Sequence, residues 1–245
     1  MKKNNDKLVK KILDMYNFND ECREQFMEII NPIYVHKQFQ RRFGKEFLHH
    51  DDVTLGEHII EDAAVTYLMS LNYLKKHHNT VIDLKIAVTI AMLHDLYTVP
   101  WQNNVEAKTH KFFNAHGFRH PIEAVINAAT WYPELFENLN NAKKIIDGIV
   151  HHMFPFPVVV FRLRDKNLLE LKNYELMNNL PIYIKRILVK STSRGRIGKI
   201  SIARSCYKEG RIMSKADFRV SVKQIRNFSS AKALLTGKNK KLLRK

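Results

Sequence analysis

The stretch IDLKIAVTIAMLHDL, residues 82–96, points most directly to the fold class of this chain. Almost every position in it is apolar, so the pattern predicts a helix that runs through a core. The run ends at His94 and Asp95, two polar residues at the end of an otherwise apolar helix. An ionised carboxylate in such a place is costly to bury unless a counter-charge compensates it, and a divalent cation is one such counter-charge.

Helical patterns continue on both sides of this stretch. The segment 55–76 is long and amphipathic, and Asp52 or Thr54 can cap its start. Glu57 follows Thr54 by three residues, which is the spacing of a capping box. Further helices are expected at residues 121–131, 140–152 and 167–179, from Pro181 onward, and from about Ile200 to Asn227. The segment 153–161 contains two prolines and is expected to be an extended connector or an edge strand. The predicted class is all-α.

The chain of 245 residues is long enough for one main domain with appendages. We expect N-terminal helices at 1–45 that pack on the core, a main domain at 46–227 with an inserted segment at about 153–200, and a basic tail at 228–245.

Cysteine content and hydropathy exclude several classes of protein. Cys22 and Cys206 are the two cysteines and form no CxxC pair, which argues against a disulfide framework and a thiolate zinc site. No apolar run approaches the roughly 20 residues that a membrane span needs. We therefore expect a cytoplasmic protein without a membrane span.

The positive charge is concentrated in the C-terminal quarter. Residues 181–245 contain 19 lysines and arginines but only two acids, Glu209 and Asp217, so they carry the whole net charge of +17. Such a region attracts anionic partners, which include small phosphorylated molecules, nucleic acid and anionic lipid. For the last dozen residues, a solvated basic tail is the simpler alternative.

Twelve histidines are present, and most fall between His49 and His152. Neutral imidazole and carboxylate oxygen are natural ligands for transition metals. His58 lies on the helix before His94, and two antiparallel helices can bring such positions level. Asp217 is an isolated acid in a basic helix, where it is either a ligand or an ion-pair partner.

The ordered set His58, His94-Asp95 and Asp217 resembles the H…HD…D signature of the HD-domain superfamily of metal-dependent phosphohydrolases. HGFRHP (116–121) and HHMFP (151–155) are similar to motifs of multi-histidine HD proteins that hold two metals, above all a group of uncharacterised bacterial ones. The resemblance covers about residues 50–225. It implies an HD-domain helical bundle with a basic C-terminal helical extension, and a bacterial source.

The resemblance also implies roles for individual residues. The ligands of one metal would be His58, His94, Asp95 and Asp217, with Asp95 as the bridging carboxylate if a second metal is bound. His120 and His152 would hold that second ion. They are preferred to His116 and His151, each of which is left as a supporting partner or a phosphate contact. Mn, Fe, Ni, Co or Zn suits such ligands, as one or two ions.

Catalysis of phosphoryl transfer needs cations near the developing negative charge. Arg119, beside His120, is the first candidate, and Lys199, Arg204 and Arg211 are further ones. With Asp95 and His116, Arg119 completes the expected catalytic set.

The sequence also departs from the family pattern. The gap between His152 and Asp217 is longer than usual, Leu-Tyr-Thr-Val-Pro-Trp follows the HD pair, and the GYP motif of cyclic-dinucleotide phosphodiesterases is absent. These departures leave the substrate open. We expect a phosphomonoesterase or phosphodiesterase that acts on a nucleotide or another small phosphorylated metabolite. The alternatives are a di-iron HD-type oxygenase and a non-enzymatic protein that binds nucleic acid or nucleotides through its basic C-terminal helices.

Overall fold

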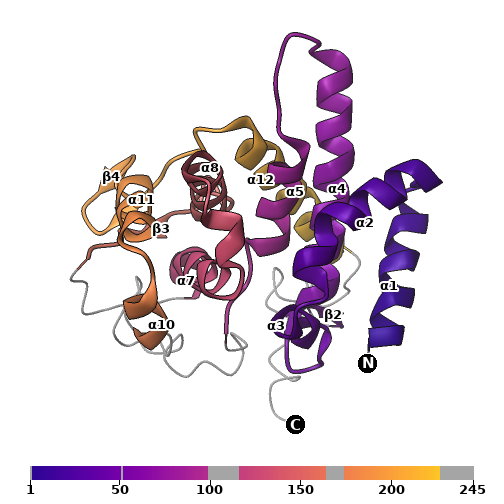
Figure 1. Ribbon diagram of the computed structural model, residues 1–245, viewed down its shortest axis with the longest axis horizontal. Coiled ribbons are helices and arrows are strands. Elements are labelled where there is room, and N and C mark those ends of the chain that lie inside the picture. The colour runs from indigo at the N-terminus through magenta and orange to yellow at the C-terminus, as the bar shows by residue number, and fades with distance from the viewer. Residues whose placement is uncertain (1, 51, 99–115, 164–173, 227–245) are drawn as a thin grey trace.

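The computed structural model describes residues 2–50, 52–98, 116–163 and 174–226, and within them the chain is all-α with a few short strands (Figure 1). The predicted fold class is therefore confirmed. The main helices are α1 (Lys2–Met15), α2 (Asp20–Tyr34), α3 (Lys37–Gln40), α4 (Leu55–Lys76), α5 (Leu84–Leu93), α7 (His116–Trp131), α8 (Leu139–Val150), α10 (Tyr174–Asn179), α11 (Ile182–Thr192) and α12 (Lys208–Arg226). Two short 3-10 helices are η1 (Arg41–Phe43) and η4 (Pro133–Phe136). The basic tail expected at 228–245 and the start of the helix expected at 167–179 lie outside the described residues.

Helices α4 and α5 form the centre of the fold. The predicted capping box starts α4: the Thr54 side chain accepts from the Glu57 amide, and the Glu57 carboxylate accepts from the Thr54 amide at 2.7 Å. Asp83 caps α5 by accepting from the Ile86 amide at 3.0 Å. From Ile86 onward α5 is buried, as its apolar sequence predicted.

Three more helices surround this pair. α12 packs against α4, α5 and α8, and α7 packs against α8. In Figure 1, α12 lies beside α5, while α7 and α8 lie on the side of α5 away from α1. This arrangement brings residues from the N-terminal, middle and C-terminal thirds of the chain to one place.

The N-terminal helices close another side of the core. α1 packs on α4, and α2 packs on α5. Phe18, Phe26 and Tyr67 form an aromatic cluster between them, with ring centroids 5.3–5.7 Å apart. The structure thus places the N-terminal helices on the core, while the bounds expected for the domains remain predictions.

Short strands complete the fold. β1 (Leu48–His50) pairs with β2 (Val53–Thr54), and β3 (Val158–Val159), β5 (Ile200–Ser201) and β4 (Arg196–Ile197) form an antiparallel sheet in that order. The edge strand expected within 153–161 is thus confirmed as β3. The expected helix start near Ile200 is wrong, because Ile200 pairs with Val159 and the helix begins only at Lys208. No described helix is long and apolar enough to cross a membrane.

Candidate metal centre

The first four expected ligands meet in the interior. His58 comes from α4, His94 and Asp95 directly follow α5, and Asp217 comes from α12. The Nε2 atom of His58 lies 3.6 Å from Oδ1 of Asp217 and 3.9 Å from Oδ2 of Asp95. The Nε2 atom of His94 lies 3.6 Å from the same Asp95 oxygen. His58 and His94 are fully buried.

The two histidines expected for a second ion lie on the other side of Asp95. Nε2 of His120, from α7, lies 3.2 Å from Oδ1 of Asp95, and Nε2 of His152, which follows α8, lies 3.7 Å from it. The Nε2 atoms of His120 and His152 are 3.1 Å apart. Asp95 therefore presents Oδ2 to His58 and His94, and Oδ1 to His120 and His152.

Asp62 belongs to the cluster, although the sequence analysis did not select it. It follows His58 by one turn of α4, and its Oδ2 lies 3.0 Å from Nε2 of His58 and 3.4 Å from Nε2 of His94. Ligand atoms of His58, Asp62, His94 and Asp217 all lie within 4.8 Å of one another. The i, i+4 spacing from His58 was the signal that could have found Asp62, because residues four apart share a helix face.

His49 is a second residue that the sequence analysis did not select. It lies in β1, and its ring stacks on His58 with centroids 3.8 Å apart and planes at 21°. Its Nδ1 atom is 3.9 Å from Oδ2 of Asp95. No periodic pattern surrounds His49 in the sequence, so only the packing of the β1–β2 hairpin reveals its position.

Hydrogen bonds behind the histidines determine which ring nitrogen faces the centre. Nδ1 of His94 lies 2.7 Å from the Ala91 carbonyl oxygen, and Nδ1 of His152 lies 2.7 Å from that of Ile149. A carbonyl oxygen can only accept, so each Nδ1 must carry the hydrogen. The neutral ring then directs the lone pair of Nε2 into the cluster, as in metal-bound histidines.

The same arrangement holds for the other two histidines. Nδ1 of His120 lies 3.2 Å from the His116 carbonyl oxygen, and Nδ1 of His58 lies 3.0 Å from Oε1 of Gln224. The Gln224 amide nitrogen donates to Glu61 at 3.1 Å, which fixes its oxygen toward His58. In the neutral form of each ring the Nε2 lone pair therefore points at the carboxylates of Asp62, Asp95 and Asp217, whereas a protonated His120 donates from Nε2 to Asp95.

This convergence leaves acceptors facing acceptors. Both carboxylate oxygens of Asp62 and Nε2 of His94 are buried and have no hydrogen-bond partner within the described part of the chain. Ligand atoms bound at about 2.1 Å to one shared ion lie roughly 3.0–3.5 Å from each other. The separations of 3.0 Å and 3.4 Å from Asp62 to the two histidines fall in that range. The buried histidine and aspartate groups are therefore compatible with a divalent metal ion.

The electrostatics of the carboxylates agree with this interpretation. Burial, reinforced by the charges of Asp217 and Asp95, raises the pKa of Asp62 well above its usual range. Burial also raises the pKa of Asp217 to about 6, although the charge of His94 opposes it. Burial favours neutral Asp95 as well, but the charge of His94, together with the hydrogen bond and charge of His120, holds the pKa of Asp95 well below its usual range. For two of the three carboxylates, Asp62 and Asp217, burial thus outweighs whatever positive charge lies nearby.

The histidine pair beside Asp95 is electrostatically unequal. Burial lowers the pKa of His120, but the hydrogen bond and charge of Asp95 outweigh it and raise that pKa. Burial and the charges of His94 and His120 hold the pKa of His152 well below its usual range. His152 is therefore a neutral ligand-type imidazole at physiological pH.

A cavity of about 270 Å³ opens beside the cluster. Asp95, His120, His152 and Asp217 line it, so the cavity reaches the candidate ligands directly. The other side chains that line it come from β1, from the chain after α5, from α7, from the turn after α8 and from α12: His49, Tyr97, His116, Met153 and Ser221. A small molecule in this cavity would contact the centre.

Of the expected catalytic residues, the structure brings Asp95 and His116 to the cavity but not Arg119. His116 stacks on His120 with ring centroids 5.0 Å apart, and burial, together with the charge of His120, lowers its pKa to about 3. Arg119 is buried in α7 and is not among the described residues that line the cavity. Because adjacent helical residues point in different directions, the place of His120 in the centre turns Arg119 away.

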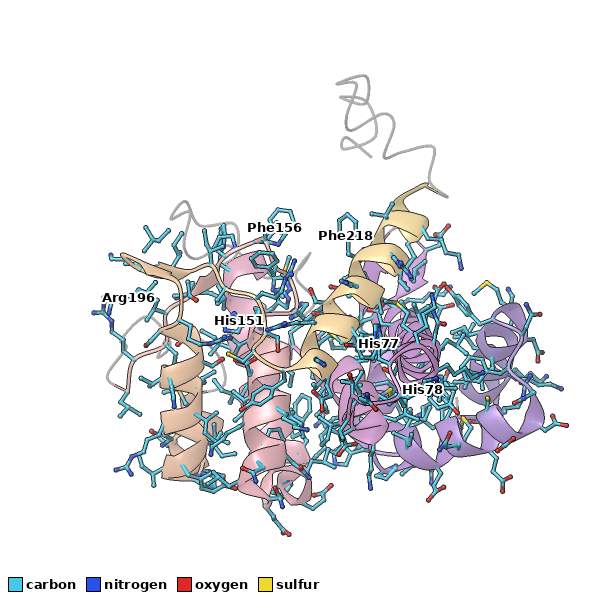
Figure 2. All side chains as sticks on the ribbon, turned by 90° about the horizontal axis from the view of Figure 1, so that it is seen from above. His77, His78, His151, Phe156, Arg196 and Phe218 are labelled. Atoms are coloured by element: carbon cyan, nitrogen blue, oxygen red, sulfur yellow. The ribbon has the colours of Figure 1, made fainter. Side chains whose placement is uncertain are left out.

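The remaining candidates also lie away from the cavity. His151 points to α11, where its Nε2 lies 3.1 Å from the Ser191 carbonyl oxygen (Figure 2). Arg204 and Arg211 line a different groove, and Lys199 is exposed in the turn between β4 and β5. The structure thus places His152, rather than His151, next to Asp95.

We compared the chain with known protein families, curated proteins and solved structures. No model of a known protein family matches the chain, and no curated protein or solved structure matches it either.

Proposed function

We propose that this protein is an HD-type, metal-dependent phosphohydrolase that acts on a nucleotide or another small phosphorylated metabolite. The single observation that carries the proposal is the buried convergence of imidazole lone pairs and carboxylates on Asp95, whose two oxygens face two separate groups of ligands. The H…HD…D resemblance supplies the reaction type.

The residues divide into two ligand groups. His58, Asp62, His94 and Asp217 would hold one ion, His120 and His152 would hold a second, and Asp95 would be shared between them. The absence of thiolates and the mixed imidazole and carboxylate set favour Mn, Fe, Ni, Co or Zn. A metal in such a site lowers the pKa of bound water and polarises phosphoryl oxygens.

The chain's own groups then orient the substrate. Tyr97 lines the cavity, and its buried hydroxyl has no hydrogen-bond partner within the described residues, so it is a candidate donor to a phosphate oxygen. His116, with its pKa lowered to about 3, stays neutral at pH 7 and can donate through one ring nitrogen. A volume of about 270 Å³ suits a phosphoryl group and a small organic remainder.

The experiment combines metal content with turnover. Purified wild type and Asp95→Ala are measured by elemental mass spectrometry and tested on phosphorylated metabolites with each candidate metal. His78→Ala is the matched control, because His78 is an exposed histidine in the turn after α4, away from α8 (Figure 2). We expect one or two metal equivalents and phosphate release in wild type and in the control, and neither in Asp95→Ala.

Two results would reject the proposal. One is a wild-type protein that stays metal-free when Mn and Fe are offered, and the other is unchanged hydrolysis by Asp95→Ala. Oxygen-dependent turnover with an iron pair would instead support the di-iron oxygenase alternative.

A further inference from the structure

A groove of about 420 Å³ runs between the second half of α4 and α12, and its walls are strongly basic. We call it the cationic groove. Its charged lining consists of Lys76, Arg204, Lys208, Arg211, Lys215 and Arg219, and no acidic residue is among the described residues that line it.

The charges of the groove are not neutralised. None of these six cations has a carboxylate oxygen within 4.0 Å among residues 2–50, 52–98, 116–163 and 174–226. Elsewhere the fold does pair its cations: Lys144 contacts Glu209 at 2.7 Å, and Arg194 contacts Asp147 at 2.6 Å. Like charges gathered in a concave site create a positive potential that attracts anions.

The side chains are nevertheless held in place. Arg211 donates through Nε to the Ser205 carbonyl at 2.7 Å, and Lys208 lies over the Tyr73 ring at 5.5 Å. These contacts orient the cations without cancelling their charge. Lys208 is also the first residue of α12, where a positive charge opposes the helix dipole, so its position does not serve helix stability.

The spacing of the cations matches an elongated anion. Lys208, Arg211, Lys215 and Arg219 recur every three or four residues along one face of α12. From Lys208 to Arg219 this face extends about 16 Å along the helix axis. A stacked strand, at about 3.4 Å per nucleotide, would place roughly five phosphates along that length, and a more extended strand fewer. A single phosphate group would contact only part of it.

The groove is separate from the candidate metal centre. Asp217 and Ser221 of α12 line the metal-centre cavity, whereas the groove is lined by four cations of α12 between Lys208 and Arg219, and the two share no described lining residue. Phe218, whose side chain is 64% exposed, projects outward from α12 next to Arg219 (Figure 2). Exposed aromatic rings beside a cationic track are platforms on which bases stack.

We propose that the cationic groove binds the phosphate backbone of single-stranded nucleic acid. A groove of about 420 Å³ can take the backbone of one strand but is too small to enclose a duplex. The concave site and the linear spacing of its cations along α12 favour one strand of nucleic acid over a planar membrane surface. This binding does not depend on the proposed hydrolase activity.

The test is fluorescence anisotropy of a labelled 20-nucleotide single strand, as RNA and as DNA, with the full chain at several salt concentrations. The groove variant combines Lys208→Ala, Lys215→Ala and Arg219→Ala. The control variant combines Arg186→Ala, Lys190→Ala and Arg196→Ala, which removes three exposed cations outside the groove. Arg196 lies on β4, on the far side of α8 from α12 (Figure 2).

We expect wild type to bind with a steep salt dependence. Losing three phosphate contacts should reduce the slope of log K against log salt by about 2 and weaken binding at least about tenfold at moderate salt. The control variant and Asp95→Ala should bind like wild type, and the result for Asp95→Ala separates this inference from the metal centre. If the triple variant fails to fold, Lys215→Ala alone should reduce the slope by about 0.7.

Several results would overturn the inference. One is a wild type that binds neither strand. Another is a groove variant that binds as wild type does, which would assign binding to other cations. If the groove variant and the control variant lose affinity equally, the binding reflects the net charge of the protein and not the groove. Binding to phosphatidylserine vesicles without binding to oligonucleotides would identify a membrane surface instead.

Discussion

Asp217 offers a direct measurement of the electrostatic cost of the centre. The side chain of Asp217 is only 14% exposed, and burial raises the pKa of its carboxyl from 3.8 to about 6. That change corresponds to about 3 kcal/mol by which the folded, metal-free protein disfavours the charged form. Asp217→Asn keeps the shape and an oxygen that can accept from Ser221, but it carries no charge. We therefore expect it to stabilise the metal-free protein by about 2–3 kcal/mol at pH 8.

The pH dependence has a definite sign. Because the folded-state pKa lies above the unfolded one, the contribution of Asp217 to stability is fully present below pH 3.8 and is lost as the pH rises through about 6. The advantage of Asp217→Asn should therefore be large at pH 8 and small at pH 4. The assay is urea unfolding in EDTA at both pH values, with Asp52→Asn, an exposed acid, as the control.

With metal present, wild type should become more stable than Asp217→Asn. A metal ion that binds only the folded state, at a free concentration of 100 times its Kd, stabilises wild type by about 2.7 kcal/mol, and Asp217→Asn should gain much less. If Asp217→Asn is no more stable than wild type in EDTA at pH 8, then the metal-free fold does not disfavour the charged carboxylate of Asp217. The electrostatic reasoning for the centre would then be refuted.

Three further predictions concern the supports of the centre and of the fold. Asp62→Ala should lower metal affinity at least 10–100-fold, measured by competition with a chelating dye, because it removes an oxygen that lies 3.0 Å from His58; affinity like that of wild type would remove Asp62 from the ligand set. Gln224→Leu should weaken metal binding by about 10–100-fold without touching the ion, since Gln224 accepts from Nδ1 of His58; an unchanged titration would show that this hydrogen bond does not hold the ring. Asp147→Ala should destabilise the fold by about 3 kcal/mol in thermal or urea unfolding, because buried Asp147 accepts from Ser205 and the Cys206 amide and pairs with Arg194; a loss below 1 kcal/mol would contradict that role.

Local patterns predicted much of the helical framework. The capping box at Thr54 and Glu57 involves residues three apart, so the start of α4 could be read from the sequence. The apolar run that became α5 likewise indicated its burial. The start of α12 could not be predicted in this way, because Ile200 is drawn into a strand by Val159, a residue about 40 positions earlier.

The residues of the candidate site were likewise predicted only in part. His58, His94, Asp95, His120, His152 and Asp217 were selected from the sequence, and the structure brings them together. Asp62 was missed, because its i, i+4 spacing from His58 is only one of several spacings among the acids of α4, and the approach of His94 is what distinguishes it. Arg119 was selected for its charge, but the direction of its side chain depends on how α7 packs.

Local sequence patterns were enough to predict the all-α class, the helices with local caps or apolar runs, and the residue types of the candidate centre. These features depend on neighbours along the chain and on intrinsic chemistry. The packing of the helices was needed to show which histidine nitrogens face which carboxylates, that Asp95 lies between two groups of histidines, and that four cations of α12 line a groove with α4 and not the centre. Such facts depend on the packing of helices far apart in sequence, because packing determines which face of each helix is buried and against what.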